Sequence, residues 1–439
     1  MGRHANQILA VALATGLQLA ASYDAIAGYT PVSDVESHSL LDLDMQAIDD
    51  GVSLLTDAGF VSAYSAYANG GNSVKSDDSI RTIRGFSLTA EEKLSGEYWF
   101  GVYEDYWGVG PDYADQFTAA ACNGTGNFAE ASFETRAEAC IKGAQYQNVW
   151  MYVIHELEDA IGDCDIDDLS ANDGGPHAWD EGWAFYAGSL EGTDGSGDGY
   201  MLHALAEKRC ANFGTCTGDV DGSPITGSAQ VNADLLELFA EGSTELINGN
   251  CDTVREIKDK IVNLITVPLV QGVLRYFYLA DPQGGAVDDD EEAEKDEAEL
   301  WAFAAAVLPR ISDCDTDLAI TIRANTELGS PSAPMAEGYV ELKQRLESAY
   351  SCMGISCSQV GGLLIDGGAD TYYEGFEPCK DSDDGGIGGT AIAFIVVAAA
   401  VAVLAVIGCV VYRRRNKKSR EAMESDLGGF GANKPTSTL

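Results

Sequence analysis

An uncharged segment of 21 residues near the C-terminus constrains this chain more than any other feature. It runs from Ala391 to Val411, and the basic residues 413–415 and 417–418 follow it directly. At about 1.5 Å per residue, a helix of this length crosses the roughly 30 Å hydrocarbon layer of a bilayer. Basic residues after a span favour its cytoplasmic side. We therefore predict a type I membrane protein with a transmembrane helix at 390–412 and a cytoplasmic tail at 413–439.

The N-terminus carries a second apolar segment, which is too short to cross a membrane. It runs from Ile8 to Ala21 behind Arg3, and the small residues Ala25 and Ala27 follow it. This pattern is typical of a secretory signal peptide, which we place at 1–27. A buried N-terminal helix is the alternative interpretation.

Cysteine usage agrees with export. Ten of the eleven cysteines lie between the two apolar segments, and the eleventh, Cys409, lies in the predicted span. An oxidising compartment would allow these ten residues up to five disulfides, whose pairing the sequence leaves open. The one N-glycosylation motif begins at Asn123.

The predicted ectodomain is strongly acidic. The chain has 70 acidic and 26 basic residues, and those between signal peptide and span number about 66 and 18, for a net charge near −48. This charge argues against nucleic-acid binding, because phosphate contacts need clustered Lys and Arg. It also raises the local concentration of cations. We interpret the acidic run Val287–Glu294 as a solvated loop.

Apolar residues recur at three- and four-residue spacing along most of the ectodomain, which indicates helices. The predicted helices cover 37–67, 90–106, 130–161, 178–190, 201–213, 232–247, 254–279, 294–307 and 336–350. Two of them have similar sequences, since the segment Trp183–Leu190 resembles the segment Trp301–Leu308. We therefore predict a mainly α fold, a duplicated helical bundle stabilised by disulfides. Its parts are an N-terminal helical region (28–129), a first repeat (130–218), a second repeat with a connecting helix (219–360) and a Gly/Asp-rich stalk (361–389).

Ionisable side chains on apolar helices mark a candidate metal site in the first repeat. On one helix, His155, Glu158 and Asp159 are expected to share a face and Glu156 to point away. The acidic pair Asp180 and Glu181 begins the next helix, where helix capping is the alternative role. Burying such groups unpaired is costly, and a bound cation would offset the cost. Carboxylates, a phenol and one imidazole suit Fe(III), so the predicted ligands are His155, Glu158, Asp180, Glu181 and Tyr186.

Four longer segments resemble the algal iron-assimilating proteins, a family that includes the diatom phytotransferrins. The segments are Gln145–Ala160, His177–Gly192, Lys208–Cys216 and Val267–Tyr276. The resemblance implies high-affinity uptake of ferric iron at the cell surface, with carbonate as a synergistic anion and endocytosis of the loaded receptor into vesicles. A surface ferric reductase and the endocytic machinery are the implied partners. A basic group is needed to hold the implied carbonate beside the metal, and we expect Arg275 to be that group. The alternative role of Arg275 is an ion pair with an acidic side chain.

Two other functions stay open. His155-Glu156-x-x-Asp159 is one residue away from the HExxH motif of zinc peptidases, but the second histidine is missing. The acids are also compatible with a non-catalytic surface or adhesion protein. We expect a metal-binding receptor and no enzyme, with a phenolate-to-iron absorption band from Tyr186.

Overall fold

The computed structural model describes residues 23–287, 289–365, 368–369 and 371–381. Most of the predicted signal peptide and all of the predicted span and tail lie outside these residues. The chain divides into one unit of residues 1–380 and a second of residues 381–439. The predicted ectodomain parts from 28 to 360 therefore all fall within one unit.

Helices dominate the described residues, which confirms the mainly α fold, and only isolated bridges occur there in place of strands. The first helical segments are α1 (Glu36–Ser39), α2 (Leu41–Val52), α3 (Asp57–Asn69), α4 (Ile83–Leu88), α5 (Ala90–Lys93), α6 (Tyr98–Trp107), α7 (Tyr113–Asn123) and η1 (Gly126–Phe128). The central ones are α8 (Phe133–Gly143), η2 (Ala144–Val149), α9 (Trp150–Asp165), α10 (Gly175–Ala187), α11 (Leu202–Phe213), α12 (Gln230–Ile247) and α13 (Cys251–Leu264). The last ones are α14 (Val267–Leu279), α15 (Asp290–Cys314), α16 (Thr316–Thr326), α17 (Tyr339–Glu347), α18 (Tyr350–Met353) and α19 (Cys357–Val360).

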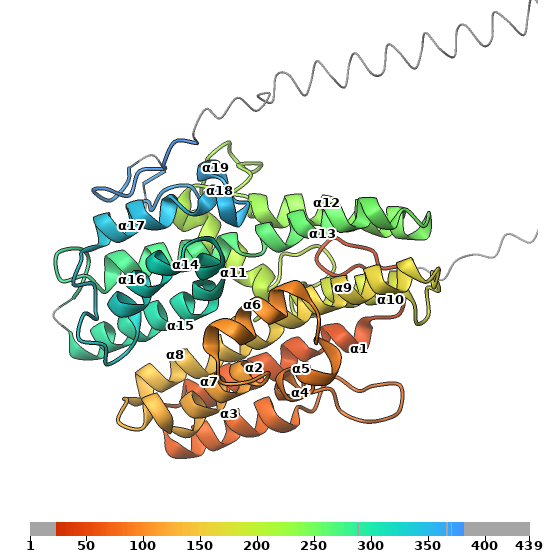
Figure 1. The fold of residues 1–439 in the computed structure, drawn as a ribbon, viewed down its shortest axis with the longest axis horizontal. Coiled ribbons are helices and arrows are strands. Elements are labelled where there is room, and N and C mark those ends of the chain that lie inside the picture. The colour runs from red at the N-terminus through yellow and green to blue at the C-terminus, as the bar shows by residue number, and fades with distance from the viewer. Residues whose placement is uncertain (1–22, 288, 366–367, 370, 382–439) are drawn as a thin grey trace, which may run out of the picture. The chain divides into compact units, whose positions relative to one another are not determined.

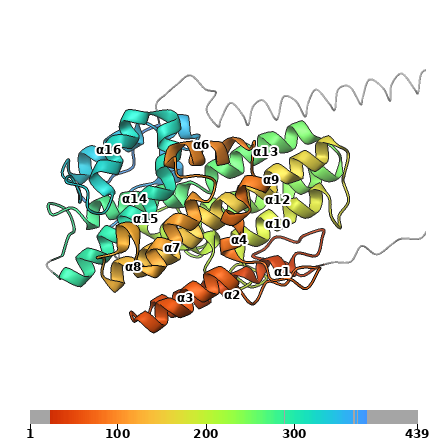
Figure 2. The same cartoon turned by 60° about the horizontal axis from the view of Figure 1, so that its bottom comes forward.

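Helix pairs form the core. Helices α9 and α10, both yellow, lie side by side in Figures 1 and 2, and α14 packs against α15 in the same unit. These two pairs contain the sequences from which we predicted a duplication, which remains a prediction. Trp150, Trp179 and Trp183 of the first pair are almost completely buried. Trp150 packs on Tyr103 of α6, and Trp179 and Trp183 both pack on Phe239 of α12, so these large side chains join the pair to neighbouring helices.

Several element boundaries differ from the predictions. The expected helix 37–67 is broken into α1, α2 and α3, because Thr56 accepts a hydrogen bond from Gly59 N and starts a new helix. The acidic run at 287–294 is helical from Asp290 onward and not a loop, although its acidic side chains from Asp289 to Glu294 are exposed, as predicted. Asp289 caps α15 by accepting from the backbone of Glu291 and Glu292, and acids in a first helical turn are favoured by the helix dipole. Helices α7 and α16 were not predicted.

The structure contains five disulfides, as predicted for the ten ectodomain cysteines. They join Cys122–Cys140, Cys164–Cys251, Cys210–Cys216, Cys314–Cys352 and Cys357–Cys379. The last bond ties residues of the expected stalk to the helices. Phe376 is fully buried, and Tyr373 stacks on Tyr278. Tyr373, Phe376 and Cys379 of the expected stalk therefore pack on the fold and do not belong to a free stalk.

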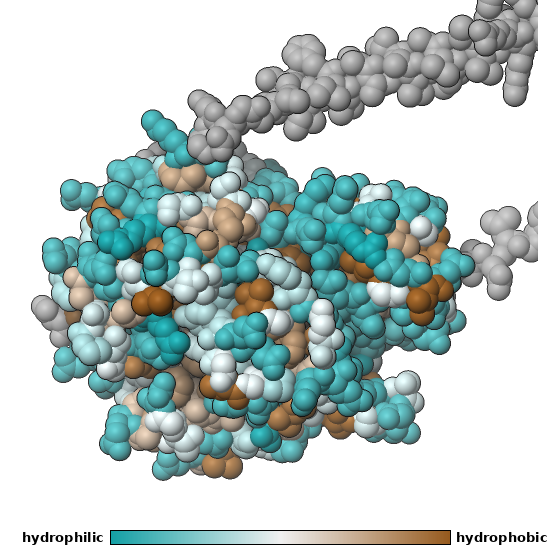
Figure 3. Space-filling view, in the orientation of Figure 1, coloured by the Kyte–Doolittle hydropathy of each residue, from teal (hydrophilic) through white to brown (hydrophobic). Residues whose placement is uncertain are grey.

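Within the described residues, one helical stretch is long and apolar enough to cross a membrane, at Cys251–Leu279. Its most apolar window is 83% buried inside the fold, as is typical of a core segment. The face shown in Figure 3 is largely hydrophilic, with hydrophobic residues spread over it. Single exposed apolar residues are common on protein surfaces and need no special explanation. The predicted span at 390–412 lies outside the described residues.

Candidate metal centre

The candidate site forms where α1 packs on the α9–α10 pair. Pro176 occupies the first turn of α10, where its missing N–H costs no hydrogen bond. His177 and Glu181 follow on the same helix. Residues four apart lie on one helical face, and His177 Nε2 is 2.9 Å from Glu181 Oε1. This helix thus presents an imidazole and a carboxylate together.

The third member comes from α1, far away in the sequence. His38 Nε2 lies 2.8 Å from the same oxygen of Glu181. The two imidazole rings meet edge to face with centroids 5.6 Å apart. Donor atoms of His38, His177 and Glu181 lie within 4.8 Å of one another, and no other such group of three or more His, Cys, Asp or Glu occurs in the described part of the chain. We call these three residues the His-His-Glu cluster.

A cavity of about 810 Å³ surrounds the cluster. The other acids that line it are Asp34, Glu36, Glu156, Asp159 and Asp173. Its basic residues are Lys75 and Arg81. Carboxylates therefore outnumber basic groups around the cluster, so the cavity favours a cation.

Burial and the contacts within the cluster shift the pKa values of its three residues. Burial would raise the pKa of Glu181, but hydrogen bonds from His177 and His38 outweigh burial and lower it strongly. Burial opposes protonation of His177, but the hydrogen bond and charge of Glu181 prevail and raise its pKa. Burial instead lowers the pKa of His38. At neutral pH, Glu181 is ionised, His38 is neutral and His177 holds a proton more readily than a free histidine.

Glu156 adds a second carboxylate beside Glu181. Burial and the nearby charge of Glu181 raise its pKa well above the usual value, and the two side chains share a hydrogen bond. Two adjacent carboxylates cannot both ionise at low cost. Without a cation, the pair therefore holds a proton on Glu156, which a bound cation would displace.

Arg81 reaches the same cavity, where the charges of Glu181 and Glu156 act on it from beyond ion-pair distance. Arg81 Nη1 donates to Ser73 Oγ at 2.8 Å, and its guanidinium lies 5.7 Å from the ring centre of Phe185. No described carboxylate forms an ion pair with it. Ser73 in turn donates to the carbonyl oxygen of Ser37, next to His38. The 73–81 loop thus holds a guanidinium beside the His-His-Glu cluster.

The chain matches the low iron-inducible periplasmic protein family (Fea1) over residues 7–371. It belongs to this algal iron-assimilation family. The match covers most of the chain and agrees with the resemblance found in the sequence. No curated protein and no solved structure matches the chain at a significant level. The cavity described above is therefore part of a low-iron-induced iron-assimilation protein.

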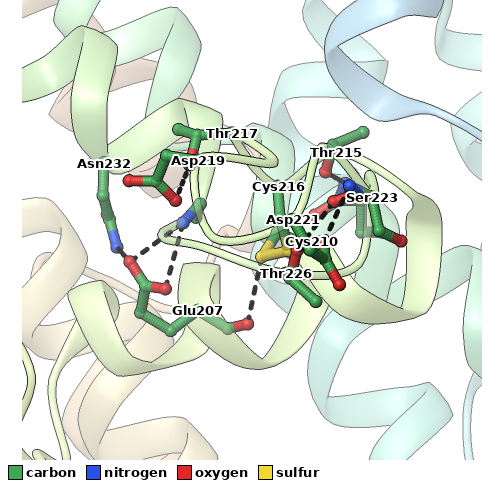
Figure 4. The surroundings of a disulfide bond; sticks show 12 residues. Glu207, Cys210, Thr215, Cys216, Thr217, Asp219, Asp221, Ser223, Thr226 and Asn232 are labelled. Atoms are coloured by element: carbon green, nitrogen blue, oxygen red, sulfur yellow. Dashed lines mark hydrogen bonds between the residues drawn. A yellow bond between two sulfur atoms is a disulfide. The ribbon is translucent and has the colours of Figure 1, made fainter.

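The five predicted ligands of this family member do not gather at one point. Of them, only Glu181 belongs to the His-His-Glu cluster. Its neighbour Asp180 accepts hydrogen bonds from Tyr29 Oη, Ser33 Oγ and the backbone of Val32 and Ser33. Tyr186 is fully buried and donates to Asn232 Oδ1 at 2.5 Å. In Figure 4, Asn232 lies beside Glu207 and donates from its side-chain amide Nδ2 to Glu207 Oε1.

Helix α9 is oriented differently from the prediction. Glu156, expected to point away, lines the cavity together with Asp159. His155 Nδ1 instead lies 2.6 Å from Glu97 Oε1, and Glu158 accepts from Lys258 Nζ at 2.7 Å. Residues 156 and 159 are three apart, and so are residues 155 and 158, so the members of each pair share a face of the helix. Spacing alone does not say which pair faces the cluster, and only the packing of α9 on α10 decides it.

Arg275, expected beside the metal, lines a different cavity with Tyr276 and Glu299. That cavity shares no lining residue with the one around the His-His-Glu cluster. Asn123 is exposed at the end of α7, where a glycan would fit, and glycosylation there stays a prediction.

Sequence reasoning missed His38, His177 and Arg81. A signal for His177 was present, since His177 and Glu181 have the four-residue spacing of one helical face. No local signal exists for His38 and Arg81, because they come from α1 and a loop that approach α10 only in the folded chain.

Asp180 is expected to stabilise the fold and to position His38 through residues 29–33. Replacing Asp180 by Asn should lower the free energy of unfolding by about 2–4 kcal/mol, because an amide leaves several buried donors unsatisfied. Chemical denaturation measures this effect. The exposed Asp194→Asn is the matched control and should change stability by less than about 0.5 kcal/mol. Equal stability of the two variants would contradict the anchoring role.

Proposed function

We propose that this protein binds ferric iron as cargo at the His-His-Glu cluster, with Glu156 as a further ligand. The observation that carries the proposal is the convergence of two imidazoles on one ionised carboxylate inside an acidic cavity. Two histidines and one carboxylate with open positions form a donor set that iron takes readily. Membership of an iron-assimilation family supports iron over other cations.

Carbonate is the proposed anion beside the metal, and Arg81 is its proposed partner. Fe(III) bound by carboxylates attracts an anion weakly, so a basic group has to hold it. A guanidinium forms two parallel hydrogen bonds with a planar oxyanion. Arg81 lines the cavity of the His-His-Glu cluster, whereas Arg275 lines the other cavity, which supports this role for Arg81 over Arg275.

The proposed cycle takes place at the cell surface. A C-terminal anchor would hold the acidic ectodomain outside the membrane, where it binds ferric iron before endocytosis. Acidification of the vesicle would then protonate the ligands and release the iron, to be reduced by a separate ferric reductase. The protein itself would act as a receptor and not as an enzyme.

Titration of the purified full chain with a weak ferric complex tests the proposal. We expect one iron per cluster, with an affinity that falls at least about tenfold in carbonate-free buffer. No tyrosine lines the cavity, so we now expect no strong phenolate-to-iron band. Iron binding that retains such a band after dialysis would contradict this ligand set.

Arg81→Gln is expected to reduce the effect of bicarbonate on iron affinity by about tenfold. The matched control is Arg275→Gln, in the other cavity, which should leave the bicarbonate effect unchanged. Iron titrations with and without bicarbonate compare the two variants. A bicarbonate effect that is lost in Arg275→Gln and kept in Arg81→Gln would reverse the assignment.

Zinc peptidase activity is a second candidate, because two histidines and a glutamate also suit catalytic zinc and Glu156 is close enough to act as a base. The motif that suggested it, however, needs His155, which contacts Glu97 instead. Peptide hydrolysis by the zinc-loaded protein, lost in Glu156→Gln, would favour this function over iron binding.

A further inference from the structure

A second cavity of about 310 Å³ lies between helices α8, α11, α14 and α15 and the segment η2. It shares no residue with the cavity of the metal centre. Segment η2 is a π-helical turn, a rare conformation that is frequent at functional sites. It presents Gln145 and Tyr146 to this cavity.

Basic residues gather here in an otherwise acidic protein. Lys142, Lys208, Arg209 and Arg275 line the cavity, with Lys208 exposed at its rim and Arg275 half-buried. Lys142 pairs with Glu138 and lies 3.4 Å from Glu299. Burial opposes the charge of Lys142, but Glu299 and Glu138 outweigh it and raise its pKa. Lys142 is therefore charged and already neutralised by acids.

Arg209 has no described carboxylate within ion-pair distance, although the charge of Glu299 on the cavity wall acts on it from farther away. It is only 8% exposed, Nη1 donates to Asn212 Oδ1 at 3.1 Å, and Nε has no hydrogen-bond partner. It forms no ion pair with a described carboxylate. Its guanidinium lies 5.3 Å from the ring centre of Phe303 and 5.8 Å from that of Tyr276. These rings hold the group in place without supplying an acceptor.

A second buried arginine shows how the same fold satisfies a guanidinium. Arg310 also has an unpartnered Nε, but its two Nη atoms meet four acceptors: Val262 O, Thr266 Oγ1, Asn263 Oδ1 and Met353 O. Arg209 has one acceptor in place of four. A buried charge with so few partners is costly, and a bound anion would remove the cost.

The position of Arg209 is also fixed by its neighbours. Cys210, the next residue, is bonded to Cys216, and Figure 4 shows this disulfide where α11 meets the following loop. Glu207 on the same helix accepts from Ala229 N and Asn232 Nδ2. Because the disulfide and these hydrogen bonds restrain this end of α11, Arg209 would lose little conformational freedom on binding a ligand.

We propose that this second cavity binds a small oxyanion, such as inorganic phosphate or a small carboxylate, through Arg209, with Lys208 and Arg275 at its rim. The volume equals that of about ten water molecules, which suits a ligand of this size. The site is independent of the metal centre. Lys208 lines the cavity and is exposed to solvent, so an anion can approach the cavity from this side.

Calorimetric titration of the metal-free full chain with phosphate and with citrate tests the proposal. At least one of these anions should bind at one site, and the phosphate and citrate titrations distinguish the two ligand sources. Arg209→Gln should weaken binding at least about tenfold, because a charge-assisted hydrogen bond is lost.

Rim variants keep the test decisive if Arg209→Gln does not fold. Lys208→Gln and Arg275→Gln should each weaken binding by about threefold, whereas Lys260→Gln, an exposed lysine on α13, is the matched control and should have no effect. The proposal is overturned if neither phosphate nor citrate binds below about 1 mM. It is equally overturned if the variants in the cavity bind like the Lys260→Gln control.

Discussion

Glu181→Gln is expected to lower ferric-iron affinity by at least about 100-fold, which is about 2.7 kcal/mol. The substitution keeps the shape of the side chain and removes the negative charge on which both imidazoles converge at 2.8 and 2.9 Å. The neutral amide would be a poor ligand for a hard trivalent ion. Iron titration of the purified full chain, in competition with a ferric chelator, measures the loss.

His155→Gln is the control for this prediction. His155 lies on the neighbouring helix and pairs with Glu97, outside the His-His-Glu cluster. Its loss should change iron affinity by less than about threefold, whereas His177→Gln should reduce it about as much as Glu181→Gln. A larger effect in His155→Gln than in His177→Gln would return the site to the residues first predicted from sequence.

Iron affinity is also expected to fall steeply between about pH 7 and 5. The pKa values of His177 and Glu156 are both raised, so both groups gain protons as the pH falls toward and below these values. A cation has to displace these protons, and each one makes affinity fall by up to about tenfold per pH unit. Glu181, whose pKa is lowered, stays ionised throughout and does not contribute to the slope.

Glu156→Gln distinguishes the contribution of the Glu156 proton to this pH dependence from that of the His177 proton. The variant has no carboxyl to titrate at this position, so the slope of log affinity against pH should decrease by about one. Proton release on iron binding, measured in weakly buffered solution, should decrease by the same number. His155→Gln again serves as the control and should keep the full slope. An affinity that does not change from pH 7 to 5 would exclude protonation of this cluster as the release mechanism.

Local features of the fold followed well from the sequence. The apolar spacing predicted α11 to within one residue, the end of α12 at Ile247, and the start of α10 to within three residues. Ten cysteines in a chain with a predicted signal peptide indicated up to five disulfides, although not their partners, and five are present in the described residues. These features depend on residues close together in the chain or on composition. Errors came where a cap decided a boundary, as at Thr56 and Asp289.

The candidate site followed only in part. The sequence indicated the α9–α10 region and Glu181, because acids on apolar helices are unusual. It did not separate Asp180 from Glu181, which are adjacent but point to different partners, Tyr29 and Ser33 for one and two imidazoles for the other. Adjacent residues on a helix differ by about 100° in direction, so a motif cannot assign their roles without knowing what packs on each face.

The sequence by itself determined the helical class, the family, the acidic charge and the helix that carries Glu181. Tertiary structure alone decided that His38 and Arg81 join Glu181, that Glu156 faces inward, and that Arg275 lies in another cavity with Arg209. The physical reason is the range of the forces involved. Helical periodicity acts over three or four residues, whereas a cavity collects side chains from segments more than 100 residues apart, and packing of whole helices determines which of them meet.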